Sequence, residues 1–109
     1  MKRGDLVIVS APGDYGKPRP AVIIQSDIFN ETHASILVCL ITSDRQDAPL
    51  FRIDVQPSEG TGLKVASQIM VDKIVALRRD RITRHIGQIN DETLIRLNRS
   101  LALFIGLAS

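Results

Sequence analysis

Runs of apolar and β-branched residues, separated by polar segments that contain glycine or proline, dominate the first half of the chain. Residues 5–10 (DLVIVS), 20–25 (PAVIIQ), 35–42 (SILVCLIT) and 50–56 (LFRIDVQ) form such runs, and each predicts a β-strand. The run at 35–42 is too uniformly apolar for a strand with one solvent face, so we expect it in the middle of a sheet. The run at 50–56 alternates apolar and polar residues, which indicates one exposed face.

Further strand-like residues follow a glycine-containing segment. The sequence PSEGTGLKVASQIMV, residues 57–71, indicates that a long loop leads into a strand and completes a hairpin, and residues 73–77 predict another short strand. The earlier segment 26–35 (SDIFNETHAS) predicts a turn or a short helix, with Ser26 or Asp27 as its cap.

The period of the pattern changes near the end of the chain. Asn90 is placed to cap a helix, and two acidic residues follow it in the first turn, where the helix dipole favours negative charge. Apolar residues recur at helical spacing at Leu94, Leu97, Leu101 and Phe104. The last residues, 101–108, are apolar nearly all round, so we expect them to need a second surface such as another subunit.

Several strands followed by one helix predict an α+β fold that is mostly β. The expected architecture is a small, strongly curved antiparallel sheet or barrel packed on a C-terminal α-helix. The chain has 109 residues, of which 44% are hydrophobic and 24% charged, and this composition is typical of one folded domain, residues 1–109. A core of this size benefits from a partner subunit, so we expect a homo-oligomer.

The net charge says little about function, and the placement of the charged residues says more. The net charge of +2, from 14 Lys and Arg against 12 Asp and Glu, is too small to indicate nucleic acid by itself. The segment RRDRITR, residues 78–84, nevertheless concentrates arginines. It predicts either a basic binding surface or an ordinary solvated face.

The single cysteine and the short apolar runs indicate where in the cell the protein is expected. Cys39 is expected to be a small buried residue, because it lies among apolar residues that pack inside a sheet. As the single cysteine it forms no disulfide within one chain. The apolar runs are too short to span a membrane. Gly4 and Asp5 lie where a signal peptide would need its apolar core. We therefore expect a cytoplasmic protein with no membrane association.

The loop before the second predicted strand carries a Lys-Pro-Arg-Pro motif, residues 17–20. Its prolines restrain the residues that precede them, so Arg19 is held stiffly at the mouth of a strand. A planar guanidinium held in this way suits a phosphate and the added charge of a phosphorane-like transition state. Lys17 adds charge, and Tyr15 is placed to stack on a base. The alternative is that the motif simply begins a strand at the surface.

Thr42 is the second candidate residue. It ends the predicted central strand and is followed by Ser43 and Asp44, so a hydroxyl emerges where the apolar interior gives way to a loop. The structural alternative is a strand that finishes in an ST-turn.

His33 and His85 are isolated, and HExxH, CxxC, Walker and GxSxG motifs are absent from the sequence. We therefore expect neither a metal nor another cofactor.

In their order and spacing these segments resemble the MazF/PemK toxins of bacterial toxin–antitoxin pairs. The resemblance covers nearly the whole chain. It depends on KRGDLVIVS, KPRPAVIIQSDIFN, LVCLITS, GTGLKVASQ and DRITRHIGQINDETLIRLNRSLALFIGL.

The resemblance implies a small SH3-like or CcdB-like barrel with a C-terminal helix, assembled as a homodimer. It also implies a metal-independent endoribonuclease that cuts single-stranded RNA at short sequences and halts translation until an antitoxin binds. The family's catalytic arginine and threonine correspond to Arg19 and Thr42, and an acidic position that some members use corresponds to Asp72.

Further residues are expected to contact RNA: Tyr15, Lys17, Ser43 and Lys73. Lys73 and Arg78 replace residues that many members of the family carry at these positions, so the cleavage sequence is not predictable.

The chemistry of RNA suits these residue types. The 2′-hydroxyl is an internal nucleophile beside the phosphorus, so cleavage leaves a 2′,3′-cyclic phosphate and a 5′-hydroxyl. Arg19 is expected to hold the charged phosphorane and Thr42 to donate a hydrogen bond to a non-bridging oxygen. Asp72 is a candidate acceptor for the 2′-hydroxyl proton, although an ordinary carboxylate is a weak base. The identity of the general base stays open.

Two other functions fit parts of the pattern. A gyrase poison of the CcdB type shares the barrel and binds a protein without chemistry, while a plain barrel that binds single-stranded nucleic acid cuts nothing. The arginine and threonine pair favours the nuclease. Its antitoxin is expected to bring an acidic, disordered tail that lies along the RNA groove against Lys17, Arg19 and the basic segment 78–84.

Overall fold

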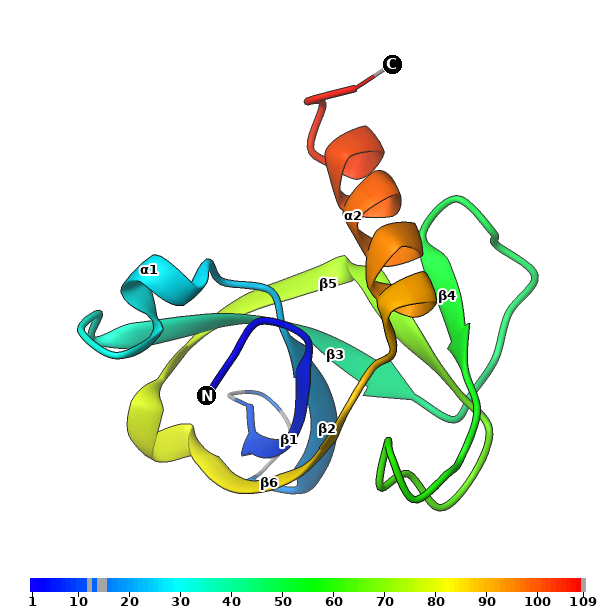
Figure 1. The fold of residues 1–109 in the computed structure, drawn as a ribbon. Coiled ribbons are helices and arrows are strands. Elements are labelled where there is room, and N and C mark those ends of the chain that lie inside the picture. Colours follow the sequence, from blue (N-terminus) through cyan, green and yellow to red (C-terminus); the bar gives the residue numbers. More distant parts are fainter. Residues whose placement is uncertain (12, 14–15, 109) are drawn as a thin grey trace.

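The structure is a computed structural model that describes residues 1–11, 13 and 16–108. Its strands and helices follow one another along the chain as shown in Figure 1. They are β1 (Asp5–Ser10), β2 (Pro18–Ile23), α1 (Asp27–Asn30), β3 (Ser35–Thr42), β4 (Arg52–Val55), β5 (Ser67–Arg78), the 3-10 helix η1 (Arg79–Arg81), β6 (Ile82–Gln88) and α2 (Asp91–Phe104).

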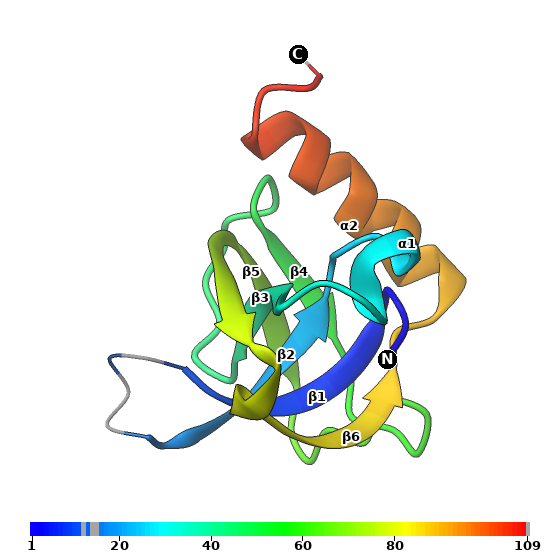
Figure 2. The same cartoon turned by 90° about the vertical axis from the view of Figure 1, so that its left-hand side faces the viewer.

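All six strands form one antiparallel sheet in the order β4-β5-β3-β2-β1-β6. The strand β3 lies in the interior of the sheet, as its apolar sequence predicted. Figures 1 and 2 show that the sheet curls strongly and that α2 crosses its β4–β5 end. The predicted mostly-β fold with a C-terminal helix is confirmed. The described strands β4 and β6 at the two edges do not pair, so the curl is open rather than a closed barrel.

The loop between β4 and β5, residues 56–66, lies against β6 and spans part of this opening. The backbone N–H of Gln88 donates to the carbonyl of Gly60 at 2.9 Å. Gly62 has a φ of 72°, and a Cβ there would collide with the carbonyl of Ile86. A Cβ at Gly87 would collide with the carbonyl of Gly60. Glycine is therefore required on both sides of the contact.

The two faces of the sheet carry separate hydrophobic clusters. One cluster includes Leu97 and Leu101 of α2 and packs the helix onto β3, β4 and β5. Cys39 belongs to this cluster and is fully buried, as expected. Burial raises the pKa of its thiol to about 12. The other cluster fills the inside of the curl with residues from β1, β2, β3 and β5.

The helix caps follow the sequence predictions. The side-chain oxygen of Asn90 accepts a hydrogen bond of 2.8 Å from the Thr93 amide, and the side-chain oxygen of Ser26 accepts one from the Ile28 amide.

Beyond the buried part of α2, the end of the chain remains apolar and exposed at Leu103, Phe104, Ile105 and Leu107. In the described residues no helix has the length and apolar character that crossing a membrane requires.

Two strand predictions need correction. The end of the basic segment and the residues after it form β6, Ile82–Gln88, which was not predicted because Thr83, Arg84 and His85 break the apolar alternation on an exposed edge strand. The strands expected within residues 63–71 and at 73–77 are one continuous strand, β5, with a register shift in its pairing to β3. An irregular ladder reverses which residues face inward, so the sequence pattern looked like two elements.

Candidate active site

Arg19 and Thr42 line one cavity of about 330 Å³ at the edge of the curl. Arg19 lies near the beginning of β2, and Thr42 is the last residue of β3. Lys17 and Ser43, two of the residues expected to contact RNA, line the same cavity. The structure thus brings together four of the predicted site residues.

The register of the sheet explains why Arg19 and Thr42 lie close together. The β2–β3 ladder ends at the pair Ala21 and Leu40. Continuing the same register by two residues sets Arg19 opposite Thr42, on one face of the sheet. The β2–β3 ladder has ended at this point, and residues of both strands beyond it line the cavity.

The prolines of the motif also fit this position. Pro18 and Pro20 pair with Ser10 and Ile8 of β1, whereas the ladder to β3 begins only at Ala21. A proline cannot donate to a ladder, so it is tolerated where the strand has one neighbour. The two prolines therefore restrain the chain on both sides of Arg19 without disrupting the sheet.

The hydroxyl oxygen of Thr42 accepts a hydrogen bond of 3.0 Å from the backbone amide of Asp44. This is the ST-turn that the sequence also suggested. The bond orients the side chain, and because a hydroxyl can donate while it accepts, Thr42 keeps its hydrogen for a ligand oxygen. The turn and a role in binding are thus compatible.

The cavity has the charge of an anion site. Lys17 and Arg19 contribute two cations, and its described lining contains no carboxylate. Thr42, Ser43 and the buried Ser67 add hydroxyl groups. This combination of guanidinium, ammonium and hydroxyl donors suits a phosphate.

Sequence reasoning missed the opposite wall of the cavity. Leu63 and Val65, from the β4–β5 loop, form this wall together with Ser67 at the start of β5. Val65 is 55% exposed although it is apolar, and the Ser67 hydroxyl donates to its carbonyl at 2.9 Å. An apolar side chain in a loop was the available signal, but its position depends on the folding of the loop against β6.

Two predicted residues lie elsewhere, and a third is not described. Neither Asp72 nor Lys73 is among the described residues that line this cavity. Asp72 faces Arg52, with 3.7 Å between its Oδ1 and the arginine Nε, and the Arg52 side chain is 8% exposed. Lys73 is exposed on β5. Tyr15 lies outside the described residues.

The basic segment 78–84 is partly structural. The Arg78 guanidinium pairs with the Asp80 carboxylate at 2.7 Å. One nitrogen of Arg79, Nη1, donates to the carbonyl of Asn30 at 2.6 Å and to that of His33 at 3.1 Å, so this residue ties η1 to the end of α1.

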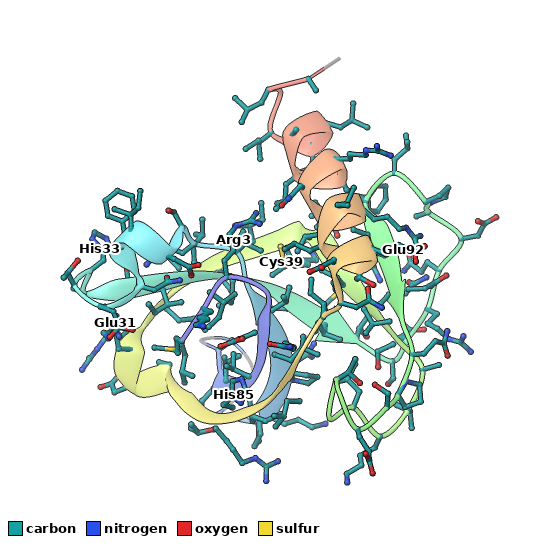
Figure 3. The ribbon with its side chains drawn as sticks, in the orientation of Figure 1. Arg3, Glu31, His33, Cys39, His85 and Glu92 are labelled. Carbon is teal, nitrogen blue, oxygen red and sulfur yellow. The ribbon has the colours of Figure 1, made fainter. Side chains whose placement is uncertain are left out.

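The histidines and the cysteine do not form a site. Figure 3 shows His33, Cys39 and His85 in separate parts of the fold. His85 Nε2 lies 3.5 Å from Asp5 Oδ2. Over the described ranges, no three His, Cys, Asp or Glu side chains are placed to share a metal ion.

Comparison with known proteins identifies the family of the chain. Residues 2–105 match the family described as PemK-like, MazF-like toxin of type II toxin–antitoxin system. A probable endoribonuclease MazF of Mycolicibacterium smegmatis is 41% identical over 109 residues, covering 99% of this chain and 99% of that protein. Endoribonuclease EndoA of Bacillus subtilis is 26% identical over 111 residues, covering 98% and 96%.

Solved structures show the same fold. An endoribonuclease in complex with its cognate antitoxin, from a mycobacterial species, has a TM-score of 0.84 at 22% identity and covers 100% of this chain and 98% of its own. MazF in a MazE–MazF crystal structure from Deinococcus radiodurans has a TM-score of 0.80 at 20% identity, with 99% and 97% covered. The resemblance inferred from the sequence is confirmed, and the chain belongs to the PemK-like, MazF-like toxins of type II toxin–antitoxin systems.

Proposed function

We propose that this chain is a sequence-specific endoribonuclease toxin that cleaves single-stranded RNA and thereby inhibits translation in the cytoplasm. The observation that carries the proposal is the convergence of Arg19 and Thr42 on one cationic cavity. The names of two relatives, both endoribonucleases, support the same reaction class.

The proposed reaction is attack of the RNA 2′-oxygen on the adjacent phosphorus. A bond forms between the 2′-oxygen and phosphorus, and the bond from phosphorus to the 5′-oxygen breaks. The 2′-hydroxyl loses its proton and the 5′-oxygen gains one, which yields a 2′,3′-cyclic phosphate and a 5′-hydroxyl. The nucleophile belongs to the substrate, so the protein needs to align it, stabilise charge and move protons.

Arg19 and Thr42 supply the charge stabilisation. The guanidinium fork of Arg19 binds the non-bridging oxygens, whose charge increases in the phosphorane, and its proline-restrained backbone lowers the entropy that binding costs. The Thr42 hydroxyl donates to one of the same oxygens. Arginine is too basic to act as the proton acceptor, so we give it no such role.

Asp72 stays the candidate for accepting the 2′-hydroxyl proton. Its carboxylate lies outside the cavity, beside Arg52. This role therefore needs an intervening water or a substrate that continues along β5. Lys73, the exposed neighbour, would contact the RNA backbone on the same path.

The remaining predicted residues are proposed to bind the nucleotides around the scissile bond. Lys17 and Ser43 contact phosphate oxygens, and Tyr15 is proposed to stack on a base. The aliphatic wall of Leu63 and Val65 faces this site from the β4–β5 loop. A base packed on that wall would be selected by its shape, so the wall contributes to the cleavage sequence.

The chain is proposed to act as a homodimer that an antitoxin neutralises. The exposed apolar residues from Leu103 to Leu107 provide surface for a second subunit. The solved relatives include toxins in complex with an antitoxin. An acidic tail on such an antitoxin would occupy the cavity at Lys17 and Arg19 and exclude RNA.

Incubation with a mixed-sequence RNA in excess EDTA tests the proposal, because the ends of the fragments report the reaction. We expect discrete cuts that end in cyclic phosphate, and loss of these cuts in Arg19→Ala. The matched control is Arg96→Ala, which removes an exposed arginine of α2 outside the cavity. Intact RNA with altered mobility, or DNA breaks that depend on gyrase, would contradict the nuclease.

A further inference from the structure

We infer that Gln68 is a positioning residue for Thr42, holding the loop that follows β3 so that the threonine hydroxyl stays directed at the scissile phosphate. The inference rests on the proposed function and adds to it a residue that does not touch the substrate. Gln68 is not among the described residues that line the cavity.

Gln68 occupies a central place beside the site. In the sheet it pairs with Thr42 of β3 on one side and with Asp54 of β4 on the other. Directly opposed residues share a face of the sheet, so Gln68 lies next to Thr42 in the same row. Its side chain is buried, with the residue 6% exposed. A buried amide requires hydrogen-bond partners.

Both ends of the Gln68 side chain find their partners, mainly in the backbone of one loop residue. Oε1 accepts a hydrogen bond of 2.9 Å from the Gln46 amide, and Nε2 donates to the Gln46 carbonyl at 2.9 Å. Nε2 also donates to Asp54 Oδ1 at 2.9 Å. The reversed amide would place a donor against an N–H and an acceptor against two oxygens, so this orientation is fixed.

This double hydrogen bond connects to Thr42 through a short segment. Gln46 lies two residues after Asp44, whose amide donates to the Thr42 hydroxyl oxygen at 3.0 Å. Residues 43–47 are all exposed and belong to neither strand nor helix. Within the described chain, the side-chain hydrogen bonds that tie residues 43–47 to β5 are those of Gln68.

Losing Gln68 therefore releases the segment that orients Thr42. The threonine remains at the end of β3, but its hydroxyl no longer has a fixed Asp44 amide to set its rotamer. A Thr42 hydroxyl that is not held toward the phosphate stabilises the transition state less, while Lys17 and Arg19 still bind the RNA backbone. The expected loss is thus in kcat rather than in KM.

Gln68→Met tests this, because methionine keeps the length of the side chain and forms none of the three hydrogen bonds. We expect kcat to fall about 10-fold to 100-fold with KM changed less than about threefold. In a Thr42→Val background the same substitution should change kcat less than about twofold, because nothing remains to position. Asp54→Asn is the matched control: it alters a neighbour of Gln68 and leaves both bonds to Gln46 in place.

Equal losses of kcat in both backgrounds would show a general structural role and overturn the inference. An unchanged kcat for Gln68→Met in the otherwise unaltered protein would overturn it too. Amide hydrogen exchange gives a second readout that needs no activity. Exchange at Asp44 and Gln46 should be at least about tenfold faster in Gln68→Met than in the parent protein. Unaltered exchange contradicts the positioning role.

Failure of the proposed function is distinguishable from failure of this inference. If the parent protein cuts no RNA, the nuclease proposal fails, and the exchange measurement still decides whether Gln68 orders the loop. If the parent cuts RNA and Thr42→Val is impaired while Gln68→Met is not, only the positioning role is lost.

Discussion

Arg19 and Thr42 line one cavity, two residues beyond the Ala21–Leu40 pair at which the β2–β3 ladder ends. The relationship follows from the sheet register rather than from sequence proximity. It means that a guanidinium fixed between two prolines and a hydroxyl fixed by the Asp44 amide face the same space. An anionic group bound there would meet both donors at once.

The hydroxyl of Thr42 can be tested by an isosteric change. Thr42→Val keeps the shape of the side chain and removes the donor, so we expect kcat for RNA cleavage to fall about 10²-fold to 10³-fold. Thr42→Ser restores a hydroxyl and should recover most of the loss. Single-turnover cleavage of one defined RNA measures both. Equal activity of the valine and serine variants would contradict a role for the hydroxyl.

The aliphatic wall of the cavity can be tested through the cleavage sequence. Val65→Ser keeps an exposed loop position but removes apolar surface from the wall. We expect kcat/KM for the preferred sequence to fall about tenfold, with smaller losses for other sequences, because shape selection of the base weakens. Sequencing the ends from a randomised RNA pool measures the profile. Glu59→Gln, an exposed residue of the same loop outside the cavity, is the control.

The contact between the β4–β5 loop and β6 can be tested by adding one methyl group. Gly87→Ala places a Cβ against the backbone of Gly60 and Thr61, so we expect the free energy of unfolding to fall by about 1–3 kcal/mol. The matched control is Gly60→Ala, whose Cβ meets only the Ser58 hydroxyl at 3.7 Å and whose φ is not in the left-handed region. Urea denaturation measures both. Equal stability of the two variants would argue against the close contact.

Cys39 predicts a dependence of stability on pH. Burial raises the pKa of its thiol from 9.0 to about 12 in the folded protein. Above about pH 9 the unfolded chain loses this proton while the folded protein keeps it. The free energy of unfolding is therefore expected to fall as the pH rises from 9 towards 12. Urea denaturation at pH 8 and pH 10 should show a smaller fall for Cys39→Ala. The same fall in both proteins would contradict the prediction.

The fold was predictable where local pattern and tertiary environment agree. The interior position of β3 followed from its uniformly apolar sequence, and the cap at Asn90 followed from the change to a helical period. The pattern failed for β6, because an edge strand with arginine and histidine on its exposed face lacks the apolar run that marks a strand. The sequence pattern predicted two strands in place of β5, because an irregular ladder changes which positions face inward.

The candidate site was predictable where its residues carry their own local signals. Arg19 is marked by its prolines and Thr42 by the end of an apolar strand. Leu63 and Gln68 carry no such mark, because their positions depend on how the β4–β5 hairpin meets β3 and β6. Asp72 was expected from family resemblance, and its carboxylate faces Arg52 instead of the cavity.

The most direct test of the account is the structure of the protein bound to an RNA that carries a 2′-deoxy nucleotide at the cleavage position, which blocks the reaction. The account predicts that the Arg19 guanidinium and the Thr42 hydroxyl both lie within about 3 Å of non-bridging oxygens of the one phosphate at that position. Contacts from the two residues to different phosphates, or a scissile phosphate bound away from both, would contradict it.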